Sequence, residues 1–244
     1  MGAILAIALL FPLHRPAAAS GKAPDASGAA LHRQLDNYVV HDKPVMFIKL
    51  RIDEALKKDP RLVPAALNWV RSYAETRDNE KFNSLFFMIY SDLNRLSLRT
   101  VKQGTPQYKN FLTGALQTLL ALEVMLTSDF ARCRSMVDPS TAGLLIAPRY
   151  EALNFSYSLL NQKEMTRIWD YALRADAAMA GRAPNKEVCS GGVNIGLAVI
   201  QGAPAEVIPK PVEAKFVDDD DWHKERTKIR AELRQYWEKR YLMR

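Results

Sequence analysis

A long apolar segment in the middle of the chain constrains the fold more than any other feature. It starts at Thr105, and the proline that follows is typical of the first turn of a helix. From 110 to 128 the sequence contains a single charged residue, Glu123. A helix that is apolar on all sides needs other helices or lipid around it. The polar Gln117 and three threonines favour helices over a membrane span, so we predict a buried central helix that ends near Cys133.

Helical spacing of apolar residues extends over most of the remaining chain. The cleanest series is 82–96, where apolar residues recur three and four positions apart. Residues 138–148 are expected to form a loop or a short helix that ends at Pro148, and residues 193–200 a short helix or strand. We therefore predict an all-α fold, an irregular bundle of about six to eight helices within residues 31–200. The other segments with this spacing are 31–39, 45–56, 62–73, 150–160 and 165–179.

The amino-terminal residues have the composition of a secretory signal. Residues 3–13 form an apolar run that, as a helix, would rise only about 16 Å, too little for a hydrocarbon core of about 30 Å. This length fits a signal peptide, and Ala17 and Ala19 fit the small-residue cleavage rule. We expect residues 1–19 to be a signal peptide, residues 20–30 a flexible leader, and the protein periplasmic or secreted. An uncleaved anchor or a buried helix is the alternative.

The chain contains two cysteines, Cys133 and Cys189. An even pair in an exported protein favours one disulfide. Closing a loop of this length would stabilise the fold by roughly 4 kcal/mol on the chain-entropy model. The alternative is two separately buried thiols. Because no cluster of histidines lies near the cysteines, we predict no zinc site, and we predict no other metal or cofactor.

The region before the last helix has a different character. Residues 201–221 contain Pro204, Pro209 and Pro211 and show little helical spacing, so we expect an extended linker or strap. The acidic run Asp218–Asp221 then precedes the last helix, where the positive end of the helix dipole favours negative charge.

The last helix, expected over residues 222–244, combines an aromatic stripe with many basic residues. A helix of this type suits a groove on a partner protein or an anionic membrane surface. The alternative is that the stripe simply completes the bundle. The residues that we expect to contact a partner are Trp222, Arg226, Arg230, Arg234, Trp237, Arg240 and Tyr241.

We find no motif that identifies catalytic residues. Ser190 lacks the Gly-x-Ser-x-Gly context of a nucleophile elbow, and the glycines that follow it do not form a phosphate-binding loop. His223 beside the acidic run could join a weak cation site, but a helix amino terminus explains the same residues. Burial could raise the pKa of Glu123 and make it a catalytic candidate; alternatively it pairs with a core arginine or faces solvent.

The residues around Cys133 form a small charged patch. Arg132 and Arg134 flank the cysteine, and Asp138 follows shortly after. Pairing of an arginine with an aspartate would fix the loop beside the disulfide. A binding role is the alternative, and we favour packing.

The formal net charge of +7 favours attraction to anionic surfaces or partners. The alternative, which we favour because acidic residues are interspersed along most of the chain, is that the excess of basic residues only keeps the protein soluble. Together these features predict an exported, non-catalytic helical protein that binds a protein partner or an anionic envelope surface. One alternative is a cell-envelope hydrolase, which requires a cleft with two carboxylates about 5 to 9 Å apart. Another is a cytosolic nucleic-acid-binding protein with reduced cysteines and strongly salt-dependent binding; we consider nucleic acid the less favoured partner.

Overall fold

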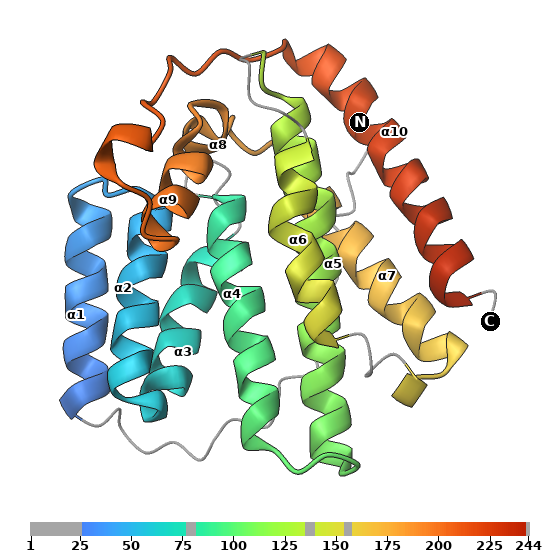
Figure 1. Cartoon of the computed structure of the whole chain (residues 1–244). Coiled ribbons are helices and arrows are strands. Elements are labelled where there is room, and N and C mark those ends of the chain that lie inside the picture. Colours follow the sequence, from blue (N-terminus) through green and yellow to red (C-terminus); the bar gives the residue numbers. More distant parts are fainter. Residues whose placement is uncertain (1–25, 77–81, 135–139, 154–157, 243–244) are drawn as a thin grey trace, which may run out of the picture.

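The computed structural model describes residues 26–76, 82–134, 140–153 and 158–242. These residues form an all-α fold with ten α-helices and no β-strand, so the predicted fold class is confirmed (Figure 1). The number of helices exceeds the predicted six to eight, partly because the one-turn helix Lys186–Cys189 is not among those predicted. The short element expected over 193–200 is present as a helix, Gly192–Ile200. The expected signal peptide lies outside the described residues.

Most consecutive helices are joined by short connections, whereas a longer segment, 201–218, precedes the last α-helix. Short 3-10 helices are η1 (Pro60–Leu62), η2 (Leu98–Thr100) and η4 (Ala205–Val207), and the π-helix η5 (Glu238–Leu242) follows the last α-helix directly. The α-helices are α1 (Ala26–Val40), α2 (Val45–Lys58), α3 (Val63–Ala74), α4 (Ser84–Ser97), α5 (Pro106–Ala131), α6 (Ser140–Leu153), α7 (Gln162–Ala178), α8 (Lys186–Cys189), α9 (Gly192–Ile200) and α10 (Asp219–Trp237).

Helix α5 is the central element, as predicted. The hydroxyl oxygen of Thr105 caps its amino terminus by accepting a hydrogen bond from the backbone N–H of Tyr108 at 3.2 Å. The helix contacts α4, α6, α7, α8 and α10, and its leucines between 112 and 126 are fully buried. By length and apolar composition α5 could cross a membrane, but 67% of its most apolar window is buried by the bundle. Core helices pass the same test, so this is weak evidence for a span.

Helices α1 to α4 lie side by side on one flank of α5, with α7 and α10 on the other (Figure 1). Helix α1 already begins at Ala26, so the last five residues of the expected flexible leader, 26–30, are helical instead. Alanines at 26, 29 and 30 are strong helix formers. They extend a helix that is held to the bundle by Leu31 and Leu35, both buried.

A carboxylate from the far end of the sequence caps α2. Pro44 precedes α2 and supplies no side-chain cap. The backbone N–H groups of Val45 and Met46 donate to the two oxygens of Glu187 in α8, at 2.7 and 3.0 Å. Burial raises the pKa of Glu187, against the lowering effect of these two hydrogen bonds. This contact fixes the α8–α9 unit on α2, where Gly196 allows close approach because a Cβ there would lie 2.4 Å from Met46 Cβ.

The structure corrects the expected end of a helix at Pro148. Helix α6 continues through Pro148 to Leu153. A proline inside a helix removes one backbone hydrogen bond and strains the preceding turn. Burial of Leu145, Ile146 and Leu153 against the bundle favours continuation nevertheless.

The segment before α10 runs largely without helix and lies against the bundle. The backbone N–H of Val212 donates to the carbonyl of Ser190 at 3.0 Å. Farther on, Arg134 donates to Lys215 at 2.8 Å and Val217 donates to Arg132 at 2.9 Å, around an isolated antiparallel bridge between residues 133 and 216. The strap therefore crosses the region where α5 and α8 meet.

Candidate functional site

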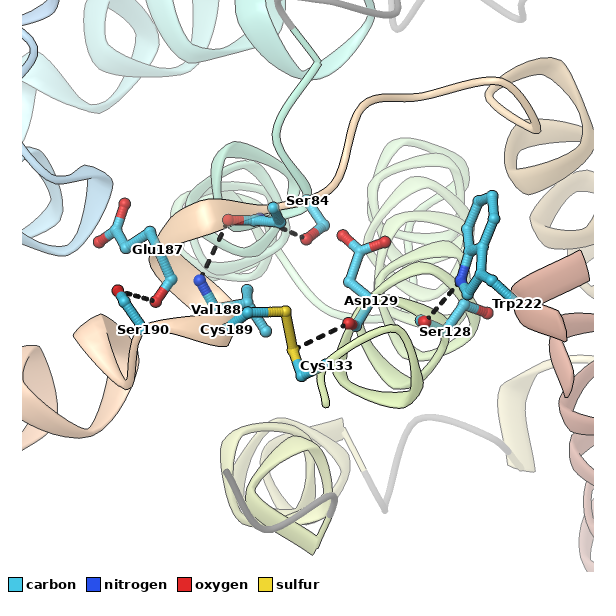
Figure 2. The surroundings of a disulfide bond; sticks show 10 residues. Ser84, Ser128, Asp129, Cys133, Glu187, Val188, Cys189, Ser190 and Trp222 are labelled. Carbon is cyan, nitrogen blue, oxygen red and sulfur yellow. Dashed lines mark hydrogen bonds between the residues drawn. A yellow bond between two sulfur atoms is a disulfide. The ribbon is translucent and has the colours of Figure 1, made fainter. Parts of the chain in front are cut away.

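The two cysteines form the predicted disulfide, which joins the end of α5 to α8 (Figure 2). The Cα atoms of Cys133 and Cys189 are 5.1 Å apart, within the usual range for a disulfide. Cys189 is fully buried, and Ser190, the residue after it, accepts the first hydrogen bond from the strap. The side-chain hydroxyl of Ser190 donates to the carbonyl of Glu187 at 3.3 Å. Ser190 is therefore part of a turn, and the disulfide anchors both the turn and the strap.

Trp222 of α10 is the main anchor of the last helix. Its side chain is 1% exposed, and its Nε1–H donates to the carbonyl of Ser128 at 2.9 Å (Figure 2). The guanidinium carbon of Arg132 lies 4.1 Å from the centroid of the indole ring, and that of Arg182 lies 5.2 Å away. Stacking of guanidinium groups on a buried indole is favourable for both partners. This arrangement makes Trp222 a core residue.

A buried charge cluster surrounds this anchor. Arg182 donates from Nε to Asp129 at 2.8 Å and from Nη1 to Asp176 at 3.1 Å. Nη2 of Arg226 lies 2.7 Å from Oδ2 of Asp176. Burial alone would lower the pKa of Arg182, but the charges of Asp129 and Asp176 raise it above its ordinary value. We call Asp129, Asp176, Arg182 and Arg226 the buried charge cluster.

The two arginines of the charged patch predicted around Cys133 pair with aspartates at the start of α10. Arg132 forms an ion pair with Asp219, and Nη2 of Arg134 lies 4.0 Å from Asp218. Asp218 also caps α10 by accepting from the backbone N–H of Asp221 at 3.0 Å. The acidic run thus caps the amino terminus of α10 and forms ion pairs with the arginines beside the disulfide. Asp138 lies outside the described residues.

The expected partner contact on the last helix is corrected for three residues. Trp222, Arg226 and Trp237 are buried in the bundle, so they are unavailable to a partner in this fold. Trp237 stacks on Trp169 with ring centroids 5.9 Å apart. Sequence spacing identified the stripe, but the bundle itself covers it.

The remaining residues of the expected contact lie at or near the surface. Arg230 donates to the carbonyl of Leu173 at 3.3 Å, and Tyr241 packs partly against the core. Arg234 pairs with Glu238 at 2.9 Å, and Arg240 donates to the hydroxyl of Tyr236 at 2.6 Å.

The charge of α10 is also balanced, because it contains as many acidic as basic residues. Lys224 lies 3.2 Å from Asp221, and Lys228 lies 3.5 Å from Glu225. The last helix is therefore a poor source of unbalanced positive charge.

Glu123 is buried with a raised pKa, as the first of the two interpretations expects; it does not face solvent and forms no ion pair with an arginine among the described residues. It is buried and accepts a hydrogen bond from the hydroxyl of Tyr150, which in turn accepts from Nε1–H of Trp237 at 3.4 Å. Burial raises the pKa of Glu123 to about 7, although the Tyr150 hydrogen bond lowers it. The carboxyl links α5, α6 and α10, so we interpret it as a structural group.

The described residues contain no group of three or more His, Cys, Asp or Glu side chains that could hold a metal ion. His223 lies against Trp222, with ring centroids 4.9 Å apart. Two cavities are relevant to binding, and each is lined by at most one carboxylate among the described residues. The pair of carboxylates required by the hydrolase alternative is therefore not found in either.

The larger cavity is a cleft of about 430 Å³ where α4, η2 and the start of α5 meet the end of α6. We call it the corner cleft. Arg95 and Arg99 bring positive charge to it, and Arg99 forms no ion pair with the described residues. The other polar groups at its border are Gln103 and Tyr108, and its apolar residues are Leu98, Val101 and Leu153.

Near the corner cleft, the carboxylate of Asp92 lies within 4 Å of three cationic side chains. Asp92 lies 2.6 Å from Arg149 and 3.7 Å from Lys49, and its contact with Arg95 is the longest of the three, at 3.9 Å. The Nε–H of Arg95 is buried and has no hydrogen-bond partner in the described part of the chain. The positive charge at this corner is therefore incompletely balanced, in contrast to α10. The cleft was not identified from the sequence: Arg95 and Arg99 lie only four positions apart, but Tyr108 of α5 and Leu153 of α6 join them only in the folded chain.

The smaller cavity, of about 220 Å³, lies between α3, α4, α5 and α7. Phe82, Phe87 and Met125 form part of its apolar wall, and Glu75 and Arg174 contribute charged groups.

Comparisons with known proteins give no relative: no family model, no curated protein and no solved structure matches this chain. Function is therefore inferred from the geometry of the described residues.

Proposed function

We propose that this chain is an exported, non-catalytic helical protein that binds an anionic surface of the cell envelope. The observation that carries the proposal is the incompletely balanced positive charge of Arg95 and Arg99 in the corner cleft. The proposal keeps the anionic partner expected from the net charge of +7 and moves the contact from α10 to this cleft.

The chemistry of the corner cleft suits a phosphate-bearing lipid headgroup. Arginine guanidinium groups bind phosphate oxygens with two parallel hydrogen bonds. Gln103 and the Tyr108 hydroxyl are further donors at the border of the cleft, and Leu153 adds an apolar wall. A basic residue near an anionic membrane contributes about 1 kcal/mol to binding, so two of them contribute a measurable amount.

Vesicle binding tests this proposal. The purified protein is mixed with vesicles of phosphatidylglycerol and phosphatidylcholine, or of phosphatidylcholine alone, and the bound fraction is measured by sedimentation. We expect binding to the anionic vesicles only, weakened by salt. The double variant Arg95→Met, Arg99→Met should bind roughly 30-fold more weakly, because about 2 kcal/mol is lost.

A matched variant separates the cleft from bulk charge. Lys224→Met, Lys228→Met also removes two positive charges, but from lysines on α10 that already have acidic partners. It should retain binding within about threefold, since paired surface charges contribute little. Equal losses in both double variants, or binding to duplex DNA but not to vesicles, would overturn the proposal.

Two observations support export. Residues 3–19 have the features of a secretory signal, and Cys133 and Cys189 are joined by a disulfide, which persists mainly in oxidising compartments. Cell fractionation followed by non-reducing mass measurement of the native protein should give a shortened chain outside the cytosol with no free thiol. A cytosolic chain with intact Met1 and two free thiols contradicts this part of the proposal.

A further inference from the structure

The cavity between α3, α4, α5 and α7 has features of a small-molecule site that is separate from the corner cleft. Its wall is apolar and firmly placed: Ala74, Phe82, Phe87, Met125 and Met179 are all buried core residues. Side chains held by the core keep their positions, so the cavity is formed before any ligand arrives.

The volume limits the size of the ligand. A dry apolar cavity of about 150 Å³ accommodates benzene in an engineered protein. The present cavity of about 220 Å³ therefore has room for a single ring or a short alkyl chain with one small substituent. It is smaller than the usual range of about 300 to 1,000 Å³ for drug-sized ligands.

The polar groups of the cavity differ in whether they already have partners. Glu75 accepts from the hydroxyl of Tyr90 at 3.0 Å and from Nε–H of Arg71 at 2.8 Å, so its charge is satisfied by the protein. Arg174 is exposed and forms no ion pair with the described residues. Among the residues that the structure describes, the free charge of the cavity is thus positive, although Glu75 is close.

Tyr171 supplies a second donor on the same face of α7. It lies one turn before Arg174, and Ala175 and Ala178 continue this face along the cavity. Burial and the charge of Glu75 raise the pKa of Tyr171 to about 12, so the hydroxyl keeps its proton at neutral pH. Within the described part of the chain, this hydroxyl has no hydrogen-bond partner.

We propose that this cavity binds a small organic acid with an apolar body, which inserts between Phe82, Phe87 and Met125 while its carboxylate meets Arg174 and Tyr171. The apolar wall gains from removal of the ring or chain from water. The guanidinium and the hydroxyl recognise the carboxylate, which gives the site a preference for acids over neutral analogues. This site stands whether or not the corner cleft binds an envelope surface.

Calorimetry with a matched pair of probes tests the site in the full chain. The probes are 3-phenylpropionate and its neutral amide, which share the apolar body and differ in charge. We expect saturable binding of the acid, and weaker binding of the amide by about tenfold or more, because a hydrogen bond to a charged group contributes more than one to a neutral group.

Two variants on α7 locate the carboxylate contact. Arg174→Met should weaken binding of the acid by about tenfold and leave the amide unchanged. Arg167→Met is the matched control, because Arg167 is exposed on the same helix but does not line the cavity; it should bind both probes as the unmodified protein does. Equal effects of the two variants would overturn the assignment of Arg174.

A third variant tests the apolar part. Ala175→Leu places a larger side chain at the cavity and should abolish binding of both probes. Ala178→Leu, at an exposed position on the same face, gives a second test should Ala175→Leu fail to fold. Absence of saturable binding of both probes to the unmodified protein, or equal affinity for the acid and the amide, would overturn the proposal.

Discussion

The buried charge cluster and the corner cleft both contain arginines, but the arginines are paired in the cluster and largely unpaired in the cleft. In the cluster, Arg182 is 1% exposed and donates to two carboxylates and to backbone carbonyls. In the cleft, Arg99 is exposed and forms no ion pair with the described residues, and Arg95 reaches Asp92 only at 3.9 Å. The first set of arginines holds α5, α7 and α10 together, whereas the second set is available to an external anion.

This contrast shows why counting basic residues is a poor guide to a binding surface. The last helix has many arginines and lysines, yet its charge is balanced and its aromatic stripe is buried. The corner cleft has only two cations: Arg99 forms no ion pair with the described residues, and Arg95 lies 3.9 Å from Asp92, a carboxylate that Arg149 approaches more closely, at 2.6 Å. What distinguishes the two regions is therefore the number of acidic partners within reach of each cation.

The largest effect is expected in the buried charge cluster. Arg182→Met leaves Asp129 and Asp176 buried without their shared partner, which should lower the free energy of unfolding by about 3 to 5 kcal/mol. Arg99→Met, in the corner cleft, should change it by less than about 0.5 kcal/mol, because the side chain is exposed and unpaired. Urea unfolding of both variants measures the difference. Comparable losses would remove the distinction between structural and available arginines.

Glu123, a buried carboxylate with no cationic partner among the described residues, extends the comparison to an unpaired buried group. The pKa of Glu123 is raised from 4.5 to about 7, so the unfolded chain ionises this group at a lower pH than the folded protein does. The associated stability is complete below about pH 4.5 and is lost as the pH rises through 7, an effect of up to about 3 kcal/mol. Glu123→Gln should remove this pH dependence, measured as the free energy of unfolding between pH 4 and 8.

Tyr150→Phe provides the complementary test for Glu123. Its hydroxyl hydrogen bond lowers the pKa of the carboxyl, so its removal should move the pH-dependent window upward. Identical pH profiles for the unmodified protein and Glu123→Gln would show that the burial of Glu123 does not affect stability as described.

Local patterns in the sequence predicted most of the helical framework. The Thr105 cap, the apolar core helix and the pairing of Cys133 with Cys189 are all present. These features depend on residues near each other in sequence or, for the disulfide, on the only possible partner. The predicted helix end at Pro148 is wrong, because burial of the surrounding α6 residues outweighs the local helix-breaking preference of proline.

The candidate sites could not be predicted in the same way. The buried charge cluster combines residues of α5, α7, α10 and the connection after α7 that are up to 97 positions apart, such as Asp129 and Arg226. In the sequence, none of these residues can be distinguished from an ordinary surface charge. Only the packing of the helices buries and pairs them. The same holds for the partner of Glu123, where a tyrosine on α6 occupies the place expected for a core arginine. Which charges are paired depends on contacts between residues that are far apart in sequence, so the pairing could not be predicted from spacing along the chain.

The smallest effect is expected for the exposed charges of α10. Arg234 and Glu238 are 2.9 Å apart but remain largely in water, so the pair should contribute at most about 0.5 kcal/mol to stability. A double-mutant cycle with Arg234→Ala and Glu238→Ala, measured by urea unfolding, gives the coupling directly. The single variant Arg234→Ala should also leave vesicle binding unchanged. A coupling near that of the buried charge cluster would mean that exposure does not separate structural from dispensable arginines, and loss of vesicle binding would return the contact to the last helix.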